Sequence, residues 1–193
     1  MHARFRSLLD VIGQGLDAGT LPFSEAASWV SEHVCESLHC DRVSVWVWSE
    51  AAAPVDPGAP RVLHRAGGHT RTTGRDAAST TALPDVVDEA DHPDYFNVLR
   101  AHAMFESTDA LADERLARMR GTALAPPGVR AMLDALIGFN GQPTGIFRCE
   151  QHDAPRVWSP ENRLDLKRFA LELSLRRARR AVREGRASRA QVD

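Results

Sequence analysis

The sequence predicts an α+β fold, in which a sheet that includes a β-hairpin packs against amphipathic helices. Residues 129–139 and 144–149 carry strand-like apolar patterns on either side of Asn140-Gly141, a pair typical of two-residue hairpin turns. Ser159-Pro160-Glu161 then predicts a helix start, because serine can accept a hydrogen bond from a free backbone N–H and proline loses none there. Amphipathic patterns at both ends of the chain predict terminal helices.

Two helices are expected before the first strand. Apolar residues recur at helical spacing in residues 4–17, and Gly19 follows as a stop signal. A second stripe spans residues 23–39, with apolar residues at intervals of three and four. Each pattern predicts a helix that buries one face.

The first strand is expected over residues 42–48. Valines occupy one face, while Ser44, Trp46 and Trp48 occupy the other, so both faces are expected to be covered. Residues 51–60 predict a hairpin loop and residues 61–65 the returning strand. Residues 67–81 have no periodic apolar pattern, which predicts a mobile loop.

Shorter elements are expected in the middle of the chain. Pro93 opens a helix that reaches about Ala101, and residues 103–106 form a short strand. Asp113 is expected to cap a helix that Gly121 ends. The last helix runs from Pro160 to about residue 184.

Length and composition exclude several classes of protein. A chain of 193 residues with 43% hydrophobic and 26% charged residues suits one globular domain. It has no apolar run near the roughly 18 residues that a membrane span needs, and no signal peptide. An odd count of three cysteines argues against a disulfide framework. We therefore expect a cytoplasmic protein without a membrane span.

The charge is unevenly distributed. Seven arginines against Glu184 and Asp193 give residues 176–193 a charge of +5, and the total of −2 leaves −7 for the rest. A basic tail can attract nucleic acid or anionic lipid. This one lacks the interleaved aromatics and the large apolar face that those roles favour, so neither partner is expected.

No metal site or catalytic constellation is expected. His33, Cys35, His39 and Cys40 would project from different faces of one helix, so no single ion could collect them. The acidic run of residues 85–94 lacks the glycine and spacing of a calcium loop. Cys149 is expected to be a packed, buried thiol.

Ordered motifs identify a resemblance over residues 20–180. They are Asp41-Arg42-Val43-Ser44-Val45-Trp46, Pro93-Asp94-Tyr95-Phe96, Asp109-Ala110-Leu111-Ala112-Asp113, Gly128-Val129-Arg130-Ala131-Met132-Leu133-Asp134-Ala135-Leu136-Ile137, Gly141-Gln142-Pro143-Thr144-Gly145, Cys149-Glu150 and Arg156-Val157-Trp158. Together they resemble the GAF domain, especially the bacterial sensory GAF domains associated with histidine kinases and diguanylate cyclases. Leu136 and Gln151 depart from that pattern, since the family usually has proline and histidine there.

The resemblance implies an antiparallel sheet of five to six strands. Long N- and C-terminal helices would cover one face, and short helices would cover a pocket on the other. It divides the chain into an N-terminal helix (1–20), a GAF domain (21–180) and a basic C-terminal tail (181–193). It also implies a homodimer formed through the terminal helices, with a histidine kinase or diguanylate cyclase as the expected output partner.

The function implied is that of a stand-alone sensory or regulatory domain that binds a small molecule of unknown identity. The residues expected at the ligand are Trp46, Trp48, Tyr95, Phe96, Phe105, Arg130, Asp134 and Phe147. The signature of cyclic-nucleotide GAF domains and the Cys-His pair that attaches bilins are both missing from the sequence.

Two alternatives remain open. One is a ligand-free dimerisation or protein-interaction module whose pocket is filled, and the departures at Leu136 and Gln151 make it reasonable. The other is a thiol-dependent redox enzyme of the methionine sulfoxide reductase type, which shares the fold. The sequence has no paired-thiol motif to support the second.

Overall fold

A computed structural model describes residues 2–48, 61–71, 86–120, 128–139 and 142–190. The helices are α1 (His2–Asp17), α2 (Phe23–Leu38), α3 (Pro93–His102) and α4 (Pro160–Ala190), with 3₁₀ turns η1 (Glu89–Asp91) and η2 (Glu114–Leu116). The strands are β1 (Arg42–Trp48), β2 (Val62–Thr70), β3 (Val86–Asp88), β4 (Met104–Ser107), β5 (Val129–Phe139) and β6 (Gln142–His152).

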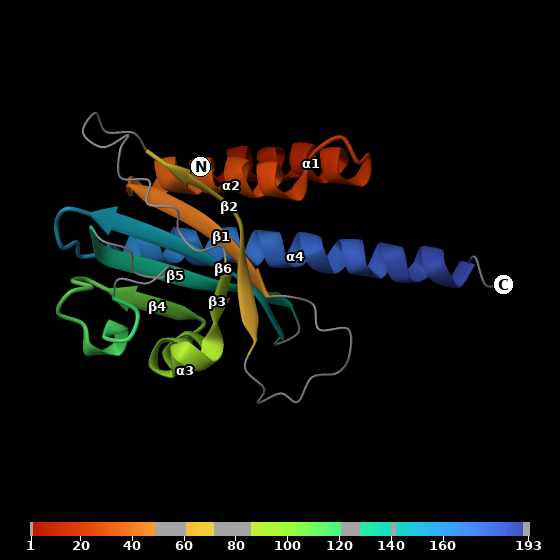
Figure 1. The fold of residues 1–193 in the computed structure, drawn as a ribbon. Helices are drawn as coiled ribbons and strands as arrows, with labels where there is room; N and C mark the ends of the chain where they lie inside the picture. The colour runs from red at the N-terminus through yellow and green to blue at the C-terminus, as the bar shows by residue number, and fades with distance from the viewer. Residues whose placement is uncertain (1, 49–60, 72–85, 121–127, 140–141, 191–193) are drawn as a thin grey trace.

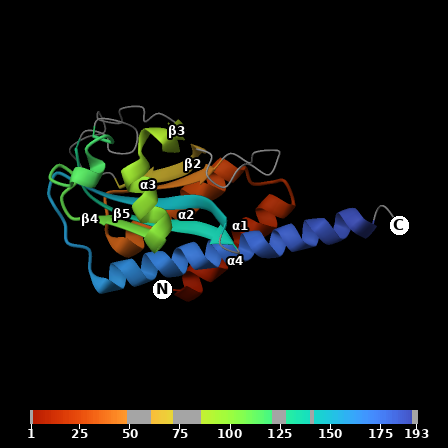
Figure 2. The same cartoon turned by 90° about the horizontal axis from the view of Figure 1, so that it is seen from below.

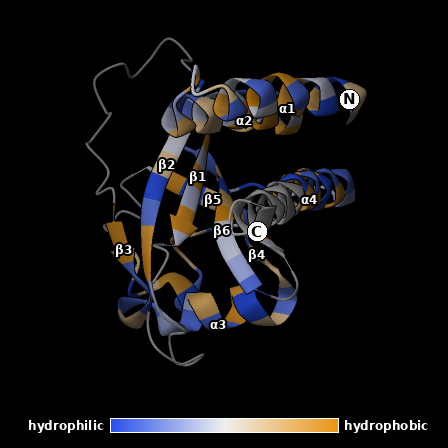
Figure 3. Ribbon diagram, turned by 90° about the vertical axis from the view of Figure 1, so that its right-hand side faces the viewer, coloured by the Kyte–Doolittle hydropathy of each residue, from blue (hydrophilic) through white to orange (hydrophobic). Residues whose placement is uncertain are grey.

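These strands form one six-stranded antiparallel sheet in the order β3-β2-β1-β6-β5-β4. The predicted α+β architecture is confirmed. Helices α1, α2 and α4 cover one face of the sheet, and α3 with the two 3₁₀ turns covers the other (Figures 1 and 3). Helix α2 packs on β1 and β2, while α4 packs on β5.

The alternation of side chains along each strand separates two cores. In β6, Ile146 packs under α3, whereas Phe147 and Cys149 pack under α1, α2 and α4. In β1, Val43 and Val45 join the core beneath α2, and Trp46 joins the core beneath α3. Both faces of the central strands are therefore buried, as predicted for residues 42–48.

Strand β2 is longer than predicted, because residues 67–70 continue the strand instead of opening a mobile loop. The reason is close packing. A Cβ on Gly67 would lie 2.6 Å from the Ser24 carbonyl oxygen and 2.9 Å from the Ala27 Cβ. Glycine thus allows α2 to approach β2, and an apolar side-chain pattern is not needed there. Residues 72–81 of the expected loop lie outside the described residues.

The turn signals are confirmed where the structure describes them. Pro93 is the first residue of α3, and Asp113 caps η2 by accepting a 3.1 Å hydrogen bond from the Arg115 backbone N–H. The helix after Asp113 is only a short 3₁₀ turn. The expected loop at residues 51–60, the Asn140-Gly141 turn and the stop at Gly121 lie outside the described residues.

None of the helices in the described part of the chain is both long enough and apolar enough to cross a membrane.

Candidate functional site

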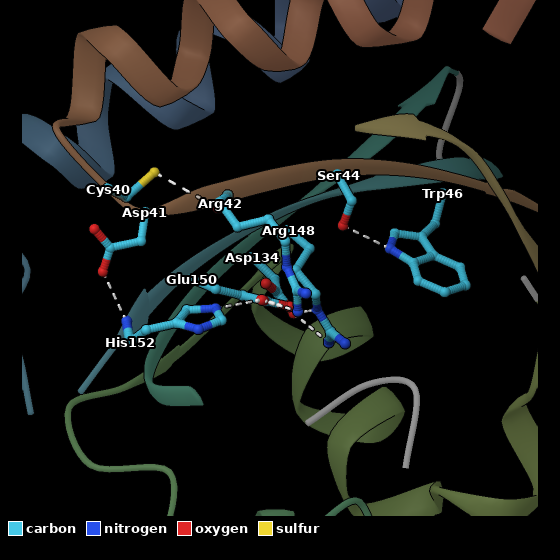
Figure 4. A network of polar contacts seen from close by, with 9 residues as sticks. All are labelled: Cys40, Asp41, Arg42, Ser44, Trp46, Asp134, Arg148, Glu150 and His152. Atoms are coloured by element: carbon cyan, nitrogen blue, oxygen red, sulfur yellow. Dashed lines mark hydrogen bonds and ion pairs between the residues drawn. The ribbon is translucent and has the colours of Figure 1, made fainter. Parts of the chain in front are cut away.

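A cluster of buried polar side chains lies on the α3 side of the sheet, among mostly apolar neighbours (Figure 4). Its centre is Asp134 on β5, Arg148 on β6 and Tyr95 on α3, and each of these exposes at most 1% of its surface. Asp134 and Arg148 face each other across the β5–β6 ladder. The hairpin register therefore sets the position of this pair.

Asp134 uses its two carboxylate oxygens unequally. Its Oδ2 accepts hydrogen bonds from Arg148 Nη2 (2.7 Å) and Nε (3.2 Å) and from the Tyr95 hydroxyl (2.5 Å). Its Oδ1 is buried and has no hydrogen-bond partner within the described ranges. A buried acceptor without a donor costs free energy, so this oxygen is a point where a ligand or water could bind.

Burial controls the ionisation of this centre. It raises the pKa of the Asp134 carboxyl, even though Arg148 and Tyr95 donate to the ionised form. The pKa of the Tyr95 hydroxyl is also raised, first by burial and then by the charge of Asp134. Burial alone would lower the pKa of Arg148, but Asp134 raises it, so the guanidinium stays charged.

His92, immediately before α3, is a second buried polar group on this side of the sheet. It is 8% exposed, and its Nδ1 has no partner among the residues that the structure places. Burial lowers its pKa, which favours the neutral imidazole. The sequence offered little signal for this residue, because a single histidine before a proline is common in loops.

A second ion pair lies next to the centre on β1 and β6. Arg42 forms a salt bridge with Glu150, which is 1% exposed, and His152 Nε2 lies 3.4 Å from the same carboxylate. Burial would raise the pKa of Glu150, but Arg42 and then His152 hold it below its ordinary value. In these two ion pairs, two carboxylates and two guanidiniums balance in charge.

Polar contacts continue from this ion pair to the start of α4. Asp41 accepts a 2.8 Å hydrogen bond from the His152 backbone N–H and another from the Gln151 side-chain amide. The side-chain amide oxygen of Gln151 accepts a 2.9 Å hydrogen bond from Arg156 Nη1. Gln151, one of the departures from the family pattern, thus connects Asp41, the residue before β1, to Arg156 in the β6–α4 loop.

Arg156 joins three elements through its guanidinium. It donates to the carbonyl oxygens of Leu38 (2.7 Å) and His39 (2.9 Å), which end α2. It also donates to the side chain of Asn162 in the first turn of α4 (3.3 Å) and stacks 4.3 Å from the centroid of the Trp158 ring. Free carbonyls at a helix end need such donors.

Most of the residues expected at a ligand lie together. Trp46, Trp48, Tyr95, Phe96 and Phe105 belong to the core beneath α3, and Asp134 lies among them. Trp48 is already engaged, because its indole N–H donates to Glu89 (2.5 Å) and the Arg61 guanidinium lies 4.5 Å from the ring centroid.

Two of the expected residues lie elsewhere. Phe147 packs into the core on the opposite face, because it sits between Ile146 and Arg148 in an alternating strand. Phe147 therefore does not lie with the residues beneath α3. Arg130 is half-buried near the beginning of β5, where its Nη2 lies 3.1 Å from Asp109 Oδ2. Its guanidinium is therefore already paired with a carboxylate.

Arg148 was missing from the expected residues, and simple pairing from the Asn140-Gly141 turn does not find it. That pairing would set Phe147 opposite Asp134, but a register shift between Ile137 and Gly138 sets Arg148 there instead. A buried carboxylate needs a nearby cation, and Arg148 is the basic residue within that reach.

A shallow hollow of about 480 Å³ lies away from the buried carboxylate, beside β4 and η2. It is lined by Glu106, Ser107, Thr108, Asp109, Ala112, Asp113 and Arg115. None of the residues expected at a ligand lines it. The cluster under α3 differs from this hollow, because its polar groups are buried and converge inside an apolar face.

The described residues contain no group of three or more His, Cys, Asp or Glu side chains that could hold a metal ion. The chain's three cysteines, Cys35, Cys40 and Cys149, are all buried in the core on the α1, α2 and α4 face. Contacts among the thiols and burial raise the pKa of Cys35, and burial raises that of Cys149. Buried, protonated thiols are poor nucleophiles.

The sequence of residues 22–176 matches the GAF domain. The chain belongs to the GAF domain family. None of the curated proteins compared with it matches in sequence.

Solved GAF structures share its fold. The GAF domain of Acinetobacter phosphoenolpyruvate-protein phosphotransferase has 14% identity and a TM-score of 0.59, covering 91% of this chain and 93% of that one. The blue-light absorbing form of the Thermosynechococcus elongatus PixJ GAF domain has 17% identity and a TM-score of 0.59, covering 94% of each chain.

A third match is the chromophore-binding domain of the bacteriophytochrome RpBphP3 from R. palustris. It has 14% identity and a TM-score of 0.60, covering 95% of this chain and 63% of that one. At these identities the likeness concerns the fold alone. A bacteriophytochrome domain, a blue-light absorbing GAF domain and a phosphotransferase GAF domain are thus among its structural neighbours.

Proposed function

We propose that this GAF domain is a sensory domain that binds a small molecule on the α3 side of its sheet. The observation that carries the proposal is Asp134, a fully buried carboxylate with one oxygen held by Tyr95 and Arg148 and the other without a partner in the described structure. Aromatic side chains surround it, as in many ligand sites.

The proposed ligand carries an N–H or O–H donor and needs no net charge. The donor would satisfy Asp134 Oδ1, and the buried carboxylates of Asp134, Glu150 and Glu89 are each already paired with an arginine. Attachment by a thioether is disfavoured, because all three cysteines lie in the opposite core. The proposed ligand therefore differs from a bilin, which a Cys-His pair would attach covalently.

The proposed output passes through α4 to a partner such as a histidine kinase or diguanylate cyclase. Polar contacts run from the Glu150 ion pair through Asp41 and Gln151 to Arg156 and the first turn of α4. A ligand that binds one of two conformations of the domain more tightly would shift the population towards that conformation. The first turn of α4 would then change its position. Homodimerisation and a cytoplasmic location, where thiols stay reduced, are parts of the same proposal.

Mass spectrometry of freshly purified protein tests the binding. We expect an added mass under native conditions that disappears after denaturation, together with protection of β5 and α3 from hydrogen exchange. An added mass that survives denaturation would contradict non-covalent binding. Protein without added mass, and without stabilisation in a metabolite screen, would contradict the sensor.

One observation favours a second candidate, the ligand-free dimerisation module. Trp46, Tyr95, Phe96 and Phe105 each expose at most 1% of their surface, so the face under α3 is closely filled. In that case a water molecule would satisfy Asp134 Oδ1. The same mass measurement separates the two candidates.

A further inference from the structure

The β5–β6 hairpin contains an irregular step close to its turn. Gly138 of β5 pairs with Pro143 of β6. The preceding residue of β5, Ile137, pairs with Gly145 and not with its neighbour. Thr144 is therefore an extra residue on β6, which makes this step a β-bulge.

This bulge determines which side chain meets the buried carboxylate of the candidate site. Successive side chains of a strand point to opposite faces, so one extra residue reverses the faces of the residues beyond it. Regular pairing from the turn would set Phe147 opposite Asp134, whereas the bulge sets Arg148 there. The buried ion pair therefore depends on the extra residue in β6.

Two features of the hairpin itself fit the bulge. The Thr144 hydroxyl donates a 3.1 Å hydrogen bond to the Ile137 carbonyl oxygen. A Cβ on Gly138 would lie 2.7 Å from the Gln142 carbonyl oxygen, so glycine is needed where the two strands approach. Residues of both strands thus contribute to this step.

A third contact comes from α4, which passes the hairpin end of β5 (Figure 2). The Gly138 backbone N–H donates a 3.0 Å hydrogen bond to Ser174 Oγ, and the Ser174 hydroxyl donates a 2.7 Å bond to the Ala170 carbonyl oxygen. One hydroxyl can form both bonds, because it has one donor and two acceptor positions. Ser174 is 6% exposed, so little water reaches this junction.

We infer that Ser174 is a positioning residue for the Asp134–Arg148 ion pair and couples α4 to the bulge that sets this pair. The inference rests on the proposed function, in which Asp134 holds the ligand. It adds a second connection between that site and α4, at the opposite end of β6 from the β6–α4 loop.

The coupling follows from the short distance between the bulge and the ion pair. Without the Ser174 hydroxyl, the Gly138 N–H loses its acceptor and the bulge opens more readily. Gly138 is four residues from Asp134 along β5, about 13 Å, so this opening reaches the ion pair. The apolar pattern of β6 keeps the overall register, and the expected change is a looser ion pair.

Hydrogen exchange measured by NMR on the full chain tests the coupling without any ligand. In Ser174→Ala, the Gly138 amide and the Arg148 Nε–H, which donates to Asp134 Oδ2, should each exchange at least tenfold faster. Ser31→Ala is the matched control, because Ser31 is a buried serine of α2 that also bonds the carbonyl four residues earlier. It should leave both rates within twofold.

A conservative variant separates the hydroxyl from mere packing. Ser174→Thr keeps a hydroxyl that can bond within the helix, so both rates should return to within threefold of wild type. Rates as fast as those of Ser174→Ala would overturn the role of the hydroxyl. A fast Gly138 amide with an unchanged Arg148 Nε–H would overturn the coupling, because Ser174 would then be a local contact only.

The coupling can also be measured from the other end, which keeps the test decisive if Ser174→Ala does not fold. Coupling free energies are reciprocal, so Asp134→Asn should speed exchange of the Gly138 amide at least threefold. An unchanged rate would overturn the inference. Absence of a ligand mass would overturn the proposed function without altering these rates, so the two failures are distinguishable.

Discussion

The Tyr95 hydroxyl donates a 2.5 Å hydrogen bond to Asp134 Oδ2, and this bond joins α3 to the centre of β5. Both residues are 0% exposed. The bond fixes where α3 lies on the sheet, and it leaves Asp134 Oδ1 as the acceptor that needs a donor. The candidate site therefore depends on the packing of a short helix over a buried ion pair.

Removing the hydroxyl should weaken this junction. Tyr95→Phe is expected to lower the free energy of unfolding by about 1 kcal/mol, because one hydrogen bond is lost while Arg148 still holds the carboxylate. Urea denaturation measures the change. Unaltered stability would show that the hydroxyl does not hold α3 to the sheet.

Replacing Arg148 is expected to destabilise the fold far more than removing the Tyr95 hydroxyl. Arg148→Met leaves the Asp134 carboxylate buried without its guanidinium, so stability at neutral pH should fall by about 3–5 kcal/mol. Denaturation curves across pH check this. Replacing both residues, as in Asp134→Leu with Arg148→Met, should recover much of the loss.

The pH dependence of Arg148→Met follows from two opposing effects on the pKa of Asp134. Burial raises it and Arg148 lowers it, so the variant raises the folded-state pKa further above the unfolded value. A folded-state pKa above the unfolded value means that the native state binds the proton more tightly, so stability is lost as pH rises through the folded pKa. The deficit relative to wild type should therefore shrink towards acidic pH. A deficit that grows in acid would contradict the assignment.

Arg156 should be important for the junction of α2, β6 and α4. Arg156→Ala removes donors to the Leu38 and His39 carbonyls, and a loss of about 2–3 kcal/mol is expected. Arg156→Lys should recover only part, because an ammonium cannot reach all of these acceptors. Arg118→Ala, at an exposed position, is the control and should change stability by less than about 0.5 kcal/mol.

Two glycines should respond in opposite ways to alanine. Gly67→Ala should destabilise the fold by about 1–3 kcal/mol, since the added carbon meets the α2 backbone at 2.6 Å. Gly13→Ala in α1 should stabilise it by about 0.5–1 kcal/mol, because the nearest atom is Arg176 Nη1 at 4.0 Å. Thermal denaturation compares the two, and a shift of the same sign in both would contradict the packing of β2 on α2.

The cysteines should be unreactive in the folded protein. Burial and thiol contacts raise the pKa values of Cys35, Cys40 and Cys149, so little thiolate forms at pH 8. A thiol-specific reagent should label all three only after denaturation. Fast labelling of Cys149 in the native state would contradict this prediction and support the alternative of a thiol-dependent redox enzyme.

Much of the fold could be predicted from local sequence signals. The alternation in β1, the proline at the start of α3 and the cap at Asp113 each depend on a residue and its near neighbours. The extension of β2 through Gly67 could not, because what keeps glycine in that strand is the approach of α2 from elsewhere in the chain. The strand propensities of the residues in β2 do not report the contact between Gly67 and α2.

The candidate site, too, could be predicted only in part from the sequence. The sequence indicated Asp134 and the aromatic residues as expected neighbours, and the structure places most of them together. Phe147 was misplaced and Arg148 was missed for one reason: a register shift between Ile137 and Gly138 exchanges the faces that these two residues would have in a regular hairpin. The unpartnered Oδ1 of Asp134 is a three-dimensional property that no local pattern reports.

Native mass spectra of the wild type and two variants test the central claim most directly. We expect a non-covalent added mass on the wild type and on Glu172→Gln, a control on the far side of the sheet, and its loss from folded Asp134→Asn. An Asp134→Asn protein that keeps the full added mass would contradict a ligand held by the buried carboxylate.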